Sequence, residues 1–196
     1  MAIPQDAWPE RFKQTADPAP VPVSNEIEIA APAEIIWEQL INTARWEAMY
    51  QNAQNIEFVD GNPSPKLKEG RTFRWDTFGI RITSTVQAFV PSSFIAWDGS
   101  FYGLPDTGFD LCSFFGLNEN QDVTDIIEPH KSSVLDVYHL WQITKIDENN
   151  CKVVTQEAQL GSLAKLNNKI LPTRMEEQHQ EWLEGLKALS EGKFEE

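Results

Sequence analysis

The stretch from Ser162 to Ser190 reads as one long amphipathic helix that follows a run of alternating strands. A helix of this length measures about 43 Å at ~1.5 Å per residue, and only an extended sheet offers its apolar face a partner of that size. Pro172 interrupts the pattern where its phase slips, so we expect a kink there. The buried stripe, spaced by three or four residues, comprises Leu163, Leu166, Ile170, Met175, His179, Trp182, Leu186 and Leu189.

Upstream of this helix, apolar and polar residues alternate with the period of two that is typical of half-buried strands. Two short helices are predicted after the first strand, one over 31–42 with Pro32 in its first turn and one around 43–52. This order of elements predicts an α+β fold with an antiparallel sheet. The predicted strands cover 23–29, 54–59, 71–78, 80–90, 94–101, 134–146 and 152–160.

The chain divides into a tail and one domain. Residues 1–20 are predicted to be an N-terminal tail with a Pro-rich linker, and residues 21–196 the ligand-binding domain. The segment 102–132 is an insertion between two strands, longer than the usual hairpin connection and rich in Phe and Leu. We expect it to be a lid over a cavity mouth, an interface of a homodimer, or a small structural insertion, and the sequence leaves these three open.

The charge balance excludes several classes of partner. A formal net charge of -14 and a pI near 4.6 argue against nucleic acid, whose phosphates require Lys and Arg, and against anionic membranes. No window has the ~18 apolar residues of a membrane span, so no stable membrane insertion is expected. No secretory signal is visible, and Cys112 and Cys151 lack CxxC spacing. A cytoplasmic protein with reduced thiols is the expectation, and one disulfide is the open alternative.

Several local strings, in their order and spacing, match a known family. They are EIEIAAPAEIIWEQLINTARWEAMY, FIAWDGS, VYHLWQI followed by CKVVTQEAQLG, and the C-terminal helix. In these pieces the chain resembles the START-like superfamily, also called SRPBCC, and within it the polyketide cyclase/dehydrase and lipid-transport group. The resemblance runs from about Val21 to Ser190 and leaves out the tail and the insertion.

The resemblance implies a helix-grip fold, in which a strongly curved antiparallel sheet wraps around the long C-terminal helix and two short helices close one end. Members of the superfamily enclose apolar small molecules such as lipids, steroids and polyketides between sheet and helix. Some are enzymes and many are carriers, so the fold alone does not decide the chemistry.

Two residues are candidates for acid–base chemistry. His139 lies on the more apolar face of its strand, where a buried imidazole serves either as a general acid or base or as a hydrogen-bonded core residue. Glu157 occupies a position that is acidic in the family pattern, and its expected partner is His139 or Arg74. A five-residue turn before the last strand places His139 beside Glu157, whereas a four-residue turn places it beside Gln156 and Ala158.

The walls of the expected cavity are aromatic. We predict that they comprise Trp75, Trp97, His139, Trp141, Met175, His179 and Trp182. The third histidine, His130, lies in a polar loop. The sequence contains no HxH or HExxH motif and no cysteine cluster, so no metal site is expected. No GxGxxG, P-loop or GxSxG string is present, so no cofactor and no serine nucleophile are expected.

Three functional hypotheses follow from these observations. The leading one is binding of a hydrophobic or aromatic small molecule, lipid- or polyketide-like, between the sheet and the C-terminal helix. The first alternative is an enzyme of the cyclase/dehydratase type in which His139 and Glu157 act as acid and base. The second alternative is a protein-interaction module that uses the apolar insertion 102–132.

Overall fold

Seven antiparallel strands form one sheet in the order β1-β7-β6-β5-β4-β3-β2. This computed structural model describes residues 7–16, 20–102, 134–165 and 173–193. The strands are β1 (Val21–Ile29), β2 (Gln54–Phe58), β3 (Thr72–Thr77), β4 (Ile80–Val90), β5 (Phe94–Phe101), β6 (Leu135–Lys145) and β7 (Cys151–Leu160). The helices are η2 (Glu10–Phe12), α1 (Ala33–Ile41), η3 (Thr43–Arg45), α2 (Trp46–Met49) and α5 (Arg174–Ser190).

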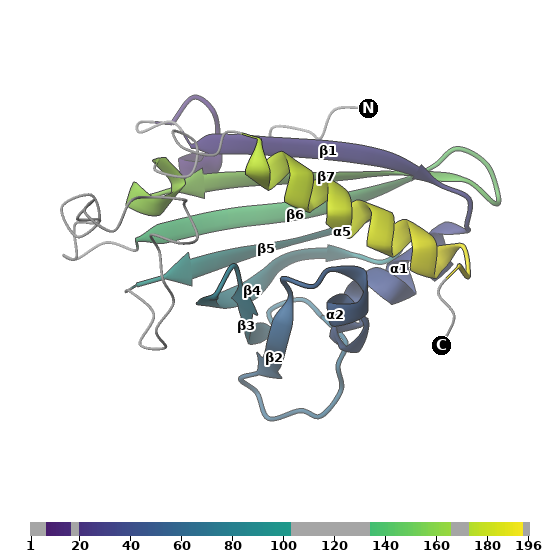
Figure 1. Ribbon diagram of the computed structural model, residues 1–196, viewed down its shortest axis with the longest axis horizontal. Coiled ribbons are helices and arrows are strands. Elements are labelled where there is room, and N and C mark those ends of the chain that lie inside the picture. Colours follow the sequence, from purple (N-terminus) through teal and green to yellow (C-terminus); the bar gives the residue numbers. More distant parts are fainter. Residues whose placement is uncertain (1–6, 17–19, 103–133, 166–172, 194–196) are drawn as a thin grey trace.

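Helix α5 lies across one face of the curved sheet and contacts β1, β7, α1 and α2 (Figure 1). Its buried stripe, His179, Trp182, Leu183 and Leu186, faces the strands. The helix-grip arrangement predicted from the sequence is therefore confirmed, with the two short helices at one end of the sheet. A helix that clasps a sheet in this way leaves the space between them as the natural place for a site.

One glycine sets how closely α5 approaches α2. A Cβ built on Gly185 would lie 2.0 Å from the carbonyl oxygen of Met49, far inside the contact distance of any real side chain. Only glycine permits this crossing, because any other residue would push the helix off α2. The close approach brings Trp182 against Tyr50, whose rings stack with centroids 4.9 Å apart.

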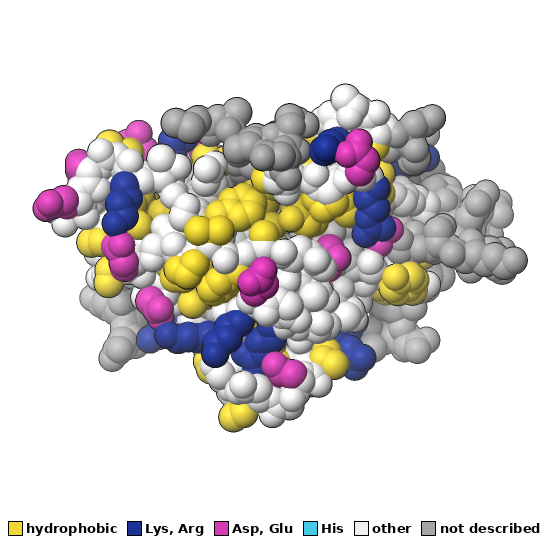
Figure 2. Space-filling view, turned by 180° about the vertical axis from the view of Figure 1, so that it is seen from behind, with side chains coloured by type: hydrophobic (Ala, Val, Ile, Leu, Met, Phe, Trp, Pro, Cys, Tyr) yellow, Lys and Arg dark blue, Asp and Glu magenta, His cyan; other side chains and the backbone are white. Residues whose placement is uncertain are grey.

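The central strands are buried on both faces. The inner face looks toward α5, while on the outer face Phe12 and Trp8 of the N-terminal segment pack on Tyr138, with ring centroids 5.7 Å apart in both pairs. Around this contact, Figure 2 shows hydrophobic side chains over the outer face of the sheet, bordered by Lys, Arg, Asp and Glu. The predicted tail thus contributes a packed turn, η2, to the outer face of the sheet.

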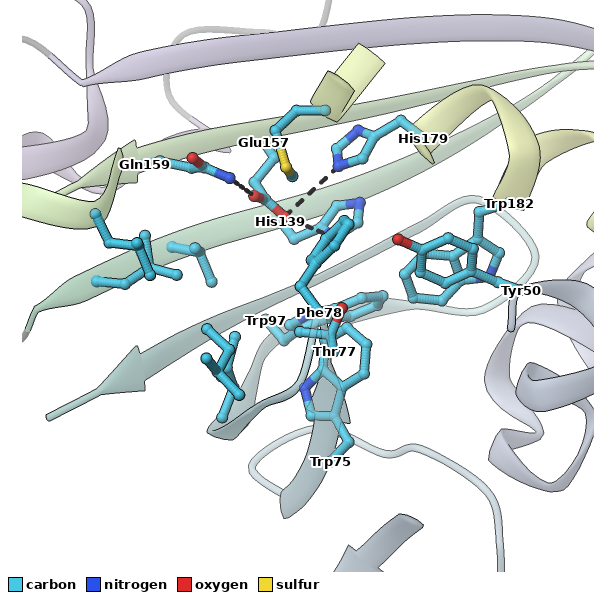
Figure 3. A pocket seen from close by; sticks show the side chains of 16 residues that line it. Tyr50, Trp75, Thr77, Phe78, Trp97, His139, Glu157, Gln159, His179 and Trp182 are labelled. Atoms are coloured by element: carbon cyan, nitrogen blue, oxygen red, sulfur yellow. Dashed lines mark hydrogen bonds and ion pairs between the residues drawn. The ribbon is translucent and has the colours of Figure 1, made fainter. Parts of the chain in front are cut away.

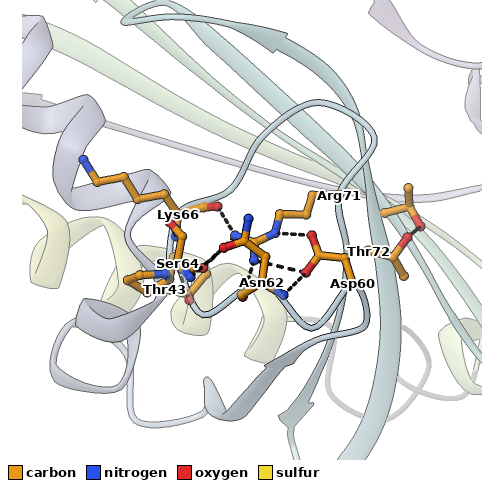
Figure 4. A network of polar contacts seen from close by, with 9 residues as sticks. Thr43, Asp60, Asn62, Ser64, Lys66, Arg71 and Thr72 are labelled. Atoms are coloured by element: carbon orange, nitrogen blue, oxygen red, sulfur yellow. Dashed lines mark hydrogen bonds and ion pairs between the residues drawn. The ribbon is translucent and has the colours of Figure 1, made fainter.

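The loop before β3 is organised by a buried arginine (Figure 4). The guanidinium of Arg71 uses all five of its N–H donors: two bonds go to the carboxylate of Asp60 and one each to the carbonyl oxygens of Asn62, Ser64 and Lys66. The ring of Phe58 covers the guanidinium at 3.4 Å. The loop between β2 and β3 is therefore a closed polar network.

Some expectations fall outside the described residues. These are the kink at Pro172, the insertion 102–132 with its lid or homodimer role, Cys112 and His130. A helical turn at 162–165 precedes the gap before α5, and Cys151 is a buried free thiol. Within the described ranges, no helix combines the length and the apolar character needed to cross a bilayer.

Candidate functional site

A cavity of about 60 Å³ lies between the sheet and α5 (Figure 3). Its walls are apolar and aromatic over most of their extent, and one end is polar. Tyr50 comes from the end of α2, the strands supply most of the wall, and α5 closes it. The lining residues are Tyr50, Trp75, Thr77, Phe78, Ile80, Ile82, Trp97, Leu135, Val137, His139, Glu157, Gln159, Leu163, Met175, His179 and Trp182.

The register of the last hairpin brings the two acid–base candidates together. Cα pairing places His139 opposite Glu157, because the strands are joined by the five residues 146–150. The five-residue alternative left open by the sequence is therefore the one adopted. Arg74, the other partner considered for Glu157, is exposed on β3 and does not reach it.

Glu157 is the centre of a buried polar cluster at the end of the cavity. Its Oε2 atom lies 3.1 Å from Nδ1 of His139 and 3.7 Å from Nε2 of His179, and its Oε1 atom accepts a 2.5 Å hydrogen bond from Nε2 of Gln159. The side chains of Glu157, His139 and His179 are 9%, 2% and 4% exposed. In the described part of the chain, its ion-pair partners are these two histidines alone.

The environment decides the charge of this cluster. Burial by itself raises the pKa of Glu157, but the hydrogen bonds from His139 and His179 outweigh it and hold that pKa below the ordinary value. Burial lowers the pKa of His139 in spite of the adjacent carboxylate. Glu157 is therefore held as a carboxylate at the polar end of the cavity.

The second nitrogen of His139 is also engaged. Its Nε2 atom lies 2.7 Å from the hydroxyl of Thr155, and that hydroxyl lies 3.4 Å from the carbonyl oxygen of Leu140. The ring is held from both sides, which fixes the direction in which Nδ1 points. His179 is held less firmly, because its buried Nδ1 atom has no hydrogen-bond partner.

Tryptophans form the apolar wall. Trp182 packs edge-on against Trp46. Its ring centroid lies 5.7 Å from that of His139, and the ring centroid of Trp97 lies 5.0 Å from that of the same histidine. The indole N–H of Trp75 donates to the hydroxyl of Ser84. Within the part of the chain that the structure describes, the buried indole N–H groups of Trp97 and Trp182 at the cavity wall have no hydrogen-bond partner.

The structure places six of the seven predicted wall residues around the cavity: Trp75, Trp97, His139, Met175, His179 and Trp182. Trp141 is fully buried behind them, against His139 and Trp182, and is not one of the lining residues. Its strand face is the predicted one, but Trp182 lies over it and separates it from the cavity. Trp141 therefore supports the wall from behind.

Sequence reasoning missed several lining residues. Tyr50 follows a four-residue helix, and burial raises the pKa of its phenol. Phe78 and Gly79 both have positive φ, 51° and 74°, as in a tight type I′ hairpin turn, and this turn aims Phe78 into the cavity. A bulky residue at such a φ is a rare signal that sequence alone does not reveal.

The convergence of His139, Glu157 and His179 was also missed. The three residues offer ligand-type atoms that lie within 4.8 Å of one another. They come from β6, β7 and α5, so no local spacing motif links them. Motif searches find ligands on one element, whereas this cluster depends on strand register and on where the helix lies.

Comparisons with known proteins agree with this architecture. A hypothetical protein of Helicobacter pylori, jhp0584, matches at 27% identity with a TM-score of 0.70, over 93% of this chain and 94% of that one. The di-domain ARO/CYC StfQ of the steffimycin biosynthetic pathway matches at 13% identity and a TM-score of 0.56, over 89% of this chain and 52% of that one. Norcoclaurine synthase of Thalictrum flavum matches at 8% identity and a TM-score of 0.55, over 91% of this chain and 90% of that one.

A scan against protein-family models and a search of curated proteins found no match. The structural matches show the fold: the chain has the helix-grip fold, as do the di-domain ARO/CYC StfQ and norcoclaurine synthase. The resemblance inferred from the sequence strings is thereby confirmed at the level of the fold.

Proposed function

We propose that the protein binds a small aromatic or apolar molecule that carries a polar group, in the cavity between the sheet and α5. The observation that carries this proposal is the buried carboxylate of Glu157 at the end of an otherwise aromatic wall. Burying ionisable groups costs free energy, and such groups cluster at functional sites. A hydroxyl or ammonium group on the ligand would donate to Glu157 while its ring lies against the tryptophans.

Two further features support a ligand of mixed character. The unused indole N–H groups of Trp97 and Trp182 are donors for an acceptor atom on the same molecule. The aromatic walls favour a flat ring over a flexible aliphatic chain, because stacked and edge-on contacts add to the hydrophobic gain. A ring with both a hydroxyl and a carbonyl oxygen, as in aromatic polyketides, would donate to Glu157, accept from the indole N–H groups and lie flat against the aromatic wall.

The size of the cavity sets a condition on binding. An engineered cavity of about 150 Å³ holds one benzene, so about 60 Å³ holds a few water molecules and no aromatic ring as the side chains stand. Phe78 and Met175 are half-buried at the cavity and Phe78 is on a hairpin turn. We propose that the outward movement of these two side chains admits the ligand.

Tryptophan fluorescence tests this proposal directly, since four of the seven tryptophans line or surround the cavity. Titration with 2-naphthol, which absorbs in the range where tryptophan emits, is expected to quench the emission saturably at one site per chain. Val137→Phe fills the cavity and is expected to abolish the saturable part. Val90→Phe makes the same change at a position that is 53% exposed and is expected to leave it unchanged.

Decanoic acid, as an aliphatic probe, is expected to compete weakly. Failure of 2-naphthol, resorcinol and decanoic acid alike to produce a saturable change that Val137→Phe removes would overturn the proposal. Equal quenching of the wild type and Val137→Phe would show contact with surface tryptophans and would overturn it as well.

A second candidate function is acid–base catalysis of the cyclase/dehydratase kind. The observation in its favour is the 3.1 Å contact between His139 and Glu157, both buried at the cavity. In this function the Glu157 carboxylate, which His139 holds in place, removes a proton next to a carbonyl group, and His139 stabilises the charges that change as the proton moves. The test is exchange of α-protons of a bound aromatic ketone with deuterated water, followed by NMR. Exchange that His139→Gln does not slow would contradict it.

A further inference from the structure

The geometry points to a binding site for a divalent transition-metal ion, formed by His139 Nδ1, Glu157 Oε2 and His179 Nε2 at the polar end of the cavity. Two imidazoles and one carboxylate are a donor set that suits Zn²⁺ or Fe²⁺ and leaves coordination positions open. This inference does not require that the protein binds an aromatic ligand. It concerns the same end of the cavity but a different occupant.

The distances lie close to those of a coordination shell. Metal–nitrogen and metal–oxygen bonds of ~2.0–2.1 Å place neighbouring ligand atoms roughly 3 Å apart. Glu157 Oε2 is 3.1 Å and 3.7 Å from the two ring nitrogens, and all three candidate atoms lie within 4.8 Å of one another. The ring centroids of the two histidines are 4.8 Å apart.

The two ring planes are within 2° of parallel, so one ring must turn for both nitrogens to point at the same ion. His179 is the ring that is free to do so, because its Nδ1 atom is buried without a hydrogen-bond partner.

The outer contacts are those that hold metal ligands in place. The Nε2 atom of His139 lies 2.7 Å from the hydroxyl of Thr155, and that hydroxyl donates to the carbonyl oxygen of Leu140. An ion bound at Nδ1 takes the place of the proton in the hydrogen bond between His139 and Glu157. Gln159 holds the other oxygen of Glu157. Ligating histidines and carboxylates are typically fixed by such second contacts.

The cavity is of the right size for the rest of the shell. Its volume of about 60 Å³ adjoins the cluster and accommodates a few water molecules. A three-residue site with open positions on a cavity is the arrangement of catalytic rather than structural ions. A bound ion would also neutralise the negative charge that the cluster carries in the apolar interior.

The test is titration of the full-length, chelator-treated protein with Co²⁺, followed by visible absorption, and with Zn²⁺, followed by calorimetry. We expect one ion per chain. Glu157→Gln and His179→Gln are each expected to weaken binding by more than about 100-fold, because each removes one of three ligands. Thr155→Val keeps all three ligands and is expected to weaken binding by about 10–100-fold. Circular dichroism establishes that each variant is folded.

The matched control is Glu184→Gln, which removes a carboxylate from the exposed face of the same helix and is expected to leave the affinity unchanged. Absence of saturable binding in the wild type would overturn the inference. Equal affinity in the wild type, Glu157→Gln and His179→Gln would show adventitious binding to the acidic surface and would overturn it too. Quenching by 2-naphthol, measured on chelator-treated protein, reports separately on the proposed function.

Discussion

Two buried charges in this protein have opposite surroundings. Arg71 has every donor satisfied by the protein: five hydrogen bonds and a covering ring from Phe58 (Figure 4). Glu157 lies at the end of an aromatic cavity beside His179 (Figure 3), and neither the Nδ1 atom of His179 nor the indole N–H groups of Trp97 and Trp182 in the cavity wall have a partner among the described residues. A closed network serves stability, whereas an open one leaves hydrogen-bonding capacity for a ligand.

The contrast predicts which network stabilises the fold more. Replacement of Arg71 by alanine removes all five hydrogen bonds that its buried guanidinium makes, so we expect a loss of about 3 kcal/mol in the free energy of unfolding. Urea denaturation measures it. Arg71→Lys is expected to lose less, since an ammonium group provides three donors without the planar fork. A loss below about 1 kcal/mol for Arg71→Ala would remove the basis of the comparison.

Glu157→Gln is expected to have a smaller effect on stability and a larger one on binding. The amide loses charge-assisted hydrogen bonds from two histidines, for which we expect a loss of about 1–2 kcal/mol in the free energy of unfolding. The same variant is expected to weaken 2-naphthol binding by about tenfold, because the acceptor for the ligand hydroxyl changes. Fluorescence titration measures this. Unchanged affinity would place the ligand away from Glu157.

The ring over Arg71 provides a finer test of the closed network. Phe58→Leu keeps apolar volume but removes the cation–π contact, and we expect a loss of about 1 kcal/mol in stability. A double-mutant cycle with Arg71→Lys isolates the coupling between the two side chains. Additive losses would mean that Phe58 contributes by packing alone.

The smallest effect is a pH dependence. The hydrogen bond from the Arg71 guanidinium lowers the pKa of Asp60 below its ordinary value of 3.8. A carboxylate with a lowered pKa contributes stability that is fully present above about pH 4 and is lost as the pH falls through its folded-state pKa. Asp60→Asn is therefore expected to be less stable than the wild type at pH 7, with the difference shrinking below pH 4. A difference that is constant over pH 2–7 would contradict this assignment.

Much of the fold was predictable from the sequence. Strand β4 was predicted over 80–90 and is found at Ile80–Val90, because a period of two over eleven residues has no helical alternative. The start of α1 at Pro32 and the break between two strands at Gly79 were also predicted from local sequence. The closed network around Arg71 was not predictable, since its acceptors are backbone carbonyl oxygens whose direction depends on loop conformation.

The candidate site was predictable as a set of residues and not as a geometry. The apolar strand face identified His139, but its pairing with Glu157 depended on one residue of turn length, which local propensity does not fix. His179 lay on the apolar helix stripe, yet its approach to Glu157 depends on the close crossing at Gly185. Phe78 was missed because only its backbone conformation turns it into the cavity.

The most direct test of the contrast is the rise in melting temperature that 2-naphthol produces in three proteins: the wild type, Arg71→Lys and Glu157→Gln. A ligand that binds only the folded state raises the melting temperature, and at a fixed ligand concentration the rise grows with the logarithm of its affinity. The account predicts an equal rise in the wild type and Arg71→Lys and a much smaller rise in Glu157→Gln. No rise in the wild type, or the same rise in all three proteins, would contradict it.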